Sequence, residues 1–205
     1  MKKILAFALA LAMILTCSLA LADRLDDIKA AGKLTVATSP DWPPYEYIDD
    51  DGNIVGTDIL MCQWMAEQLG VELEVQPMAF DACLAAVGQG DVDMMVAGLT
   101  YDEARLNRME LTGIYWNEGD QGLLVKKGTG ASYNSAESFA GKNVAAQNGT
   151  NQQIMVEEQL PDANLELVTK IPDGVNMVKN GRVDVRFTSE EYARQFADEF
   201  LGTEV

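Results

Sequence analysis

The sequence predicts an α/β protein made of two lobes. Short apolar runs alternate with amphipathic stretches that end at glycine, which is typical of strands connected by helices in a parallel sheet. The strand–turn–helix pattern of the first half recurs in the second half. The chain has 205 residues, of which 48% are hydrophobic, and this is enough to build two small cores.

The first half is predicted to follow the order strand, helix, strand, helix, strand. Strands are expected at residues 33–38, 71–75 and 92–97, helices at residues 58–69 and 81–88, and a hairpin at residues 46–55. Asp81 is expected to cap the second helix, and Gly70 and Gly90 to stop the two helices. With the first strand central, right-handed crossovers place the helices on opposite faces of the sheet. Cys62 and Cys83 are therefore predicted to be free, buried thiols.

The second half repeats this plan. Strands are expected at residues 122–127, 143–146 and 165–168 and from residue 183, and helices at residues 135–139, 152–159 and 173–179. The domain boundaries follow: a signal peptide at 1–22, lobe 1 at 23–117, lobe 2 at 118–189 and a C-terminal tail at 190–205. One interpretation of this tail is the remnant of a helix that closes lobe 1.

The N-terminus has the pattern of a secretory signal peptide. Lys2 and Lys3 precede an uncharged apolar run over residues 4–22, which ends in Ala-Leu-Ala. We expect a periplasmic or extracellular protein. Two alternatives remain open, a lipid anchor at Cys17 and an uncleaved membrane anchor.

Charge and composition exclude several classes of function. The net charge is −17 and the chain contains no His, which argues against a nucleic-acid partner and against a soft-metal site. The lack of His also excludes Ser-His-Asp and Cys-His catalysis. We expect neither an enzyme nor a cofactor.

The segment at residues 97–105 is a candidate anion site. It follows the apolar strand at residues 92–96 and turns into a charged stretch. Small residues at such a turn leave backbone N–H groups free to meet an anion. Arg105 lies one helical turn further on, where its guanidinium can bind a carboxylate through two hydrogen bonds. The alternative is an ordinary turn with a solvated Arg.

A set of ordered motifs resembles one protein family. The motifs are SPDWPPY at 39–45, GTDI at 56–59, FD at 80–81, GDVDMMVAGLT at 90–100, Arg105, QNGT at 147–150 and GRVD at 181–184. Together they resemble the extracellular solute-binding proteins of bacterial amino-acid ABC transporters, the polar amino-acid family. The resemblance covers residues 26–185. It implies a type II periplasmic-binding-protein fold whose lobes clamp one free amino acid, a monomer, and a membrane permease as partner.

The resemblance also implies roles for the residues of lobe 1. Arg105 would hold the α-carboxylate of the ligand, supported by Thr100, and the Gly98 carbonyl would accept from the α-amino group. Trp42 and Phe80 would form aromatic walls of the cleft, with core packing as the alternative for both.

Lobe 2 would complete the site from the opposite side. Gly149 and Thr150 would bring backbone N–H groups to the carboxylate at a helix N-terminus, with a plain helix cap as the alternative. Asn151 and Gln147 would contact the ligand side chain.

The chain departs from the family pattern at its C-terminal end. Ser189 stands where the family has an Asp that pairs with the α-amino group, and Arg186 is unusual in a buried strand. Only residues 190–205 follow, where the family crosses back to lobe 1. We therefore expect weak binding or none, and a truncated non-binding paralogue, a sensor module and, least favoured, a dehydratase-type enzyme remain as alternatives.

The residues near the expected ligand side chain favour a polar, uncharged amino acid. Ser39 is neutral at a position where binders of basic amino acids carry an acid. Asp41 is the remaining candidate partner for a cationic side chain.

Overall fold

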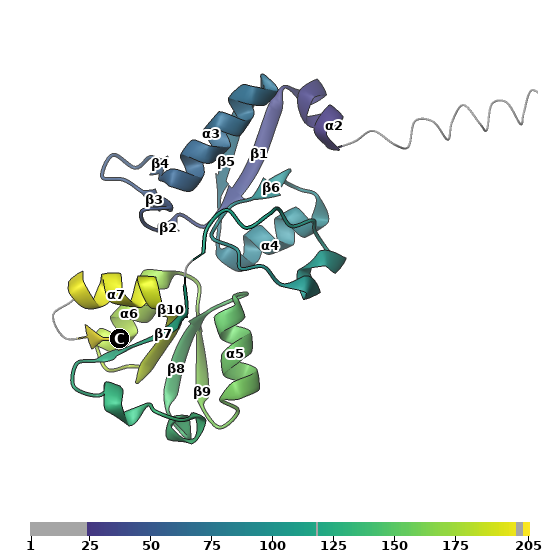
Figure 1. The fold of residues 1–205 in the computed structure, drawn as a ribbon. Coiled ribbons are helices and arrows are strands. Elements are labelled where there is room, and N and C mark those ends of the chain that lie inside the picture. The colour runs from purple at the N-terminus through teal and green to yellow at the C-terminus, as the bar shows by residue number, and fades with distance from the viewer. Residues whose placement is uncertain (1–23, 118, 200–202) are drawn as a thin grey trace, which may run out of the picture.

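The chain forms two α/β lobes joined by the segment between strands β6 and β7 (Figure 1). The computed structural model describes residues 24–117, 119–199 and 203–205. The predicted signal peptide lies outside these ranges. Within them, no helix is both long enough and apolar enough to cross a membrane.

The sheet of the first lobe has three parallel strands in the order β5-β1-β6, so the first strand is central, as predicted. The elements of this lobe are α2 (Arg24–Ala31), β1 (Lys33–Thr38), α3 (Thr57–Leu69), β5 (Glu72–Pro77), α4 (Phe80–Gln89), β6 (Met94–Met95) and the 3-10 helix η1 (Glu103–Asn107). Gly70 and Gly90 adopt the left-handed conformation at the C-caps of α3 and α4, which confirms the predicted stops. The predicted capping of α4 by Asp81 is wrong, because Ala79 is the N-cap and Asp81 lies within the first turn.

Alternating side chains of β1 separate two apolar clusters. Leu34 and Val36 pack with Cys62 of α3, whereas Ala37 packs with Cys83 of α4. Successive residues of a strand point to opposite faces, so the two helices cover opposite faces of the sheet. Both cysteines are free and buried, as predicted.

A small antiparallel sheet extends lobe 1 toward the second lobe. It consists of β2 (Asp41–Trp42), β3 (Glu46–Ile48) and β4 (Ile54–Val55) in that order. The turn between β3 and β4 is held by Asp49, whose carboxylate accepts from the backbone N–H groups of Asp51 and Asn53. The predicted hairpin is therefore confirmed.

The second lobe contains a five-stranded sheet in the order β11-β7-β10-β8-β9. β10 is parallel to β8 and antiparallel to β7, and β8 is parallel to β9. The elements are β7 (Gln121–Lys126), η2 (Gly130–Ser132), η3 (Ala136–Phe139), β8 (Asn143–Gln147), α5 (Asn151–Gln159), β9 (Asn164–Val168), α6 (Ile171–Lys179), β10 (Val185–Ser189), α7 (Glu190–Glu199) and β11 (Thr203–Glu204).

The C-terminal segment belongs to lobe 2. Tyr192, Ala193 and Phe196 of α7 are buried against Leu124 of β7. Gly122 permits this close approach, because a Cβ there would overlap the backbone of Glu190. β11 then pairs with β7. This differs from the interpretation of residues 190–205 as the remnant of a lobe 1 helix, because apolar contacts with β7 bind α7 to the second sheet.

Candidate functional site

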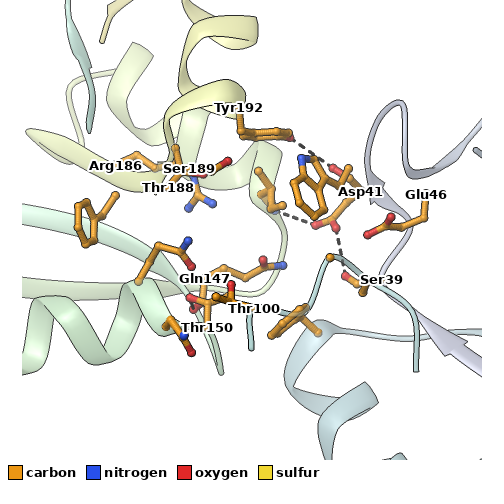
Figure 2. Close-up of a pocket in the computed structure, with 18 of the residues that line it drawn as sticks. Ser39, Asp41, Glu46, Thr100, Gln147, Thr150, Arg186, Thr188, Ser189 and Tyr192 are labelled. Carbon is orange, nitrogen blue, oxygen red and sulfur yellow. Dashed lines mark hydrogen bonds between the residues drawn. The ribbon is translucent and has the colours of Figure 1, made fainter. Parts of the chain in front are cut away.

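A cavity of about 50 Å³ lies between the two lobes. Figure 2 shows Ser39, Asp41 and Glu46 on one side of it and lobe 2 residues such as Gln147, Arg186 and Ser189 on the other. The predicted site residues that line it are Trp42, Phe80, Gly98, Thr100, Arg105, Thr150, Asn151 and Ser189, together with Gln147. The structure thus brings together residues that lie far apart in the sequence.

Arg105 reaches across the cavity from η1. Its Nη2 donates to Asn151 Oδ1 at 2.9 Å and to the Gly149 carbonyl oxygen at 3.3 Å. Its Nε is buried without a hydrogen-bond partner. Burial lowers the pKa of this guanidinium, and Asp102 partly opposes that shift. Because both acceptors are neutral, a carboxylate would be a stronger partner for Arg105 than the groups it contacts.

Gly98 and Trp42 form one wall of the cavity. Gly98 has a φ of +55°, and a Cβ at this position would overlap the indole ring of Trp42. Trp42 is 8% exposed and also packs against Tyr45 and against Tyr192 of α7. Phe80 is buried at the first turn of α4. Both aromatic residues therefore line the cavity and are packed in the interior.

Gly149 is the predicted site residue that does not line the cavity. Its N–H donates to Gln153 Oε1 at 2.9 Å, and its carbonyl accepts from Arg105. Thr150 is the N-cap of α5, and its hydroxyl accepts from the backbone N–H of Gln153. The helix-cap alternative therefore describes Thr150 in this structure, although its side chain also borders the cavity.

Ser189 ends β10 and is buried beside the cavity, where it presents a neutral hydroxyl. Across the cavity from Ser189, Asp41 of lobe 1 supplies a carboxylate. Asp41 Oδ2 accepts from the Ile171 N–H at the start of α6 at 2.8 Å, and Oδ1 accepts from Ser39 Oγ at 3.1 Å. Burial raises the pKa of Asp41, and these hydrogen bonds and Arg186 oppose the shift. Asp41 thus connects the two lobes.

Glu46 is a lining residue that the sequence did not single out. It is 1% exposed, and its Oε2 has no hydrogen-bond partner. Burial, followed by the neighbouring carboxylates of Asp58 and Asp41, raises the pKa of Glu46 to about 10. Glu46 is therefore a neutral acid at physiological pH, which can donate as well as accept a hydrogen bond. No pattern in the sequence signals this, because the burial arises from the packing of β3 against α3.

Tyr115 is hydrogen-bonded to Asp58, the carboxylate next to Glu46. Its hydroxyl donates to Asp58 Oδ2 at 2.8 Å, and burial raises the pKa of Asp58. The described residues contain no cluster of side chains suited to hold a metal ion.

A second, larger hollow of about 830 Å³ adjoins the first. It borders β6 and residues 109–117, where Ile114, Tyr115 and Trp116 are exposed. Arg105, Thr150 and Asn151 do not line it. The smaller cavity is therefore the one with the chemistry for a carboxylate.

Comparison with known proteins decides the family. Residues 34–186 match the model of the bacterial extracellular solute-binding proteins, family 3. The chain belongs to this family. Its two lobes are those of the type II periplasmic binding proteins, which are its structural neighbours.

Two curated relatives of the solute-binding family illustrate the sequence similarity. The L-cystine-binding protein TcyJ of Escherichia coli is 27% identical over 160 residues, and the match covers 78% of this chain and 60% of TcyJ. The arginine-binding extracellular protein ArtP of Bacillus subtilis is 29% identical over 166 residues, with 80% of this chain and 64% of ArtP covered. The chain thus spans about 60% of the length of these relatives.

Several solved structures match a larger share of this chain than the two curated relatives do. An amino-acid ABC transporter substrate-binding protein from Streptococcus pneumoniae, bound to L-arginine, is 35% identical with a TM-score of 0.82, covering 89% of this chain and 77% of that one. A truncated, arginine-bound ArgBP from T. maritima is 31% identical with a TM-score of 0.81, covering 87% and 84%. An ancestral amino-acid-binding protein described as a precursor of cyclohexadienyl dehydratase is 27% identical with a TM-score of 0.79, covering 88% and 79%.

Proposed function

We propose that this chain is the extracytoplasmic amino-acid-binding component of an ABC importer, without catalysis of its own. The observation that carries the proposal is Arg105, a partly buried guanidinium that lines a cavity between two lobes and forms no ion pair with any described residue. The names of several relatives support the same class of ligand, and those that include the words ABC transporter support a membrane permease as partner.

Binding requires the lobes to move apart or Arg105 to rearrange. The cavity holds about 50 Å³, which is room for only a few water molecules. Arg105 is held by Asn151 and Gly149, so an entering carboxylate would exchange these neutral acceptors for its own oxygens. A ligand that contacts both lobes would then stabilise their association.

A thermal-shift screen against the twenty common amino acids tests the proposal. At a ligand concentration of about 100 times Kd, the melting temperature should rise by roughly 5–10 °C. Arg105→Met should abolish the shift. Arg108→Met is the matched control, because Arg108 is exposed in the same segment and does not line the cavity.

The alternative is a non-binding paralogue, favoured by the direct hydrogen bonds that Arg105 makes to lobe 2. Folded protein that gives no shift with any amino acid would support this alternative and contradict the proposal.

A further inference from the structure

Arg186 is a buried cation without a hydrogen-bond partner for two of its donors. It lies on β10 and is 2% exposed, and neither Nε nor Nη1 has a hydrogen-bond partner in the part of the chain that the structure describes. Buried polar groups are almost always hydrogen-bonded, and an unpaired buried charge is among the least favourable arrangements in a protein. Arg186 lines the cavity, and Figure 2 shows it beside Ser189 and Thr188.

The fold provides a slot for this side chain. Gly174 of α6 lies against the guanidinium, and a Cβ there would come within 2.5 Å of Nη1. A side chain at position 174 would therefore displace Arg186. The absence of a side chain at Gly174 thus leaves the space that Arg186 occupies.

No carboxylate of the described residues forms an ion pair with Arg186. Asp41 and the Tyr192 ring lie close enough to influence its charge. However, the Asp41 carboxylate oxygens accept from Ser39 and from the N-terminus of α6. Asp41 therefore influences the charge of Arg186, while no hydrogen bond or ion pair joins the two side chains among the described residues.

The charges that line the cavity do not balance. The cations are Arg105 and Arg186. The acids are Asp41 and Glu46, and Glu46 is neutral at physiological pH because of its raised pKa. The cavity thus has an excess of positive charge, and a ligand of net negative charge would neutralise it.

We infer that the site takes an amino acid with a second carboxylate, one carboxylate binding Arg105 of lobe 1 and the other binding Arg186 of lobe 2. The inference rests on the proposed function and specifies its substrate class. It replaces the preference for a polar, uncharged side chain that the sequence indicated. A dicarboxylic amino acid would also connect the lobes, since its two carboxylates would bind residues on opposite sides of the cavity.

The test compares acids with amides of equal size. L-glutamate against L-glutamine, and L-aspartate against L-asparagine, are titrated calorimetrically into the full chain. At least one acid should bind about tenfold or more tightly than its amide, because only the acid offers Arg186 a charged partner. This comparison uses the unmodified protein and needs no variant to fold.

Variants of Arg186 then test whether this side chain causes the preference for acids over amides. Arg186→Met should remove the difference between acid and amide, because neither ligand then meets a charged partner on β10. Arg186→Lys should restore part of it. Arg182→Met is the control, because that side chain is 71% exposed and does not line the cavity, and it should leave both affinities unchanged.

The outcomes separate the two claims. Amides that bind as tightly as acids, or an acid preference that survives in Arg186→Met, would overturn the dicarboxylate assignment while amino-acid binding stands. Absence of binding by all twenty amino acids would overturn the proposed function and the assignment with it.

Discussion

At the scale of single residues, Glu46 shows how packing changes the chemistry of a side chain. Burial keeps it protonated in the folded state, with a pKa of about 10 against an ordinary value of 4.5. Between these values the folded chain binds a proton that the unfolded chain has released. Stability should therefore fall as pH rises through this window. The raised pKa values of Asp41 and Asp58 act in the same direction.

Glu46→Gln should flatten this dependence, because the amide imitates the protonated acid and does not titrate. Urea unfolding at about pH 6 and about pH 8.5 measures it, and one proton accounts for a slope of at most about 1.4 kcal/mol per pH unit. The variant should be more stable than the parent at the higher pH. Parallel curves for the two proteins would contradict the burial of a neutral Glu46.

Gly98 has a positive φ, and it also lies so close to the Trp42 ring that a side chain would not fit there. Gly98→Ala should cost about 1–3 kcal/mol more than Gly32→Ala, since the added methyl group would overlap the indole ring. Gly32 is the matched control because its φ is +68° and nothing lies within 4 Å of a Cβ placed there. Urea unfolding of the two variants measures the difference, and equal costs would show that Trp42 does not lie against Gly98.

At the scale of elements, helix α7 is an integral part of lobe 2. Phe196→Ala should destabilise the protein by about 3–5 kcal/mol, because it removes an aromatic ring from the cluster around Leu124. Arg194→Ala, on the exposed side of the same helix, should stay within about 0.5 kcal/mol of the parent. Equal, small effects in urea unfolding would mean that α7 is not packed on the sheet.

The placement of α3 and α4 on opposite faces has a chemical consequence. Cys62 and Cys83 should remain separate thiols, and they should react slowly with alkylating reagents in the folded chain, because burial raises the pKa of each to about 12. Peptide mapping after alkylation in denaturant, without reductant, should find both thiols modified. A disulfide-linked peptide containing both would contradict the predicted topology.

Elements whose signals are local could be predicted from the sequence. Gly70 and Gly90 stop their helices, and the alternation of apolar residues placed the strands of both lobes to within a few residues. Given the expected central position of β1, the handedness of the crossovers was enough to place α3 and α4 on opposite faces of the sheet. α7 was not predicted as a lobe 2 helix, because its position depends on contacts with β7, a strand about seventy residues earlier in the chain.

The candidate site was predictable where a motif marks it. Arg105 and Thr100 follow a recognisable strand end, and the structure places both at the cavity. Arg186 was noted only as unusual, and Glu46 was missed. Both side chains matter because they are buried, and Arg186 also because it lies against Gly174 of α6. Such contacts between separate elements have no local signal in the sequence.

At the scale of the whole molecule, direct contacts hold the two lobes together. Asn148 Nδ2 donates to Asp81 Oδ2 at 2.7 Å, Asp41 accepts from the N-terminus of α6, and Trp42 of lobe 1 packs in the core of lobe 2. A ligand in the cavity would add its interactions to these. The association of the lobes is therefore the property that binding should strengthen.

Binding of an amino acid at the cavity can be measured by calorimetric titration of the full chain with the amino acid that gives the largest thermal shift. We expect one site per chain and a loss of at least about thirtyfold in affinity in Arg105→Met, with the affinity of Arg108→Met unchanged. Unaltered affinity in Arg105→Met would contradict the claim that this cavity binds the carboxylate of an amino acid.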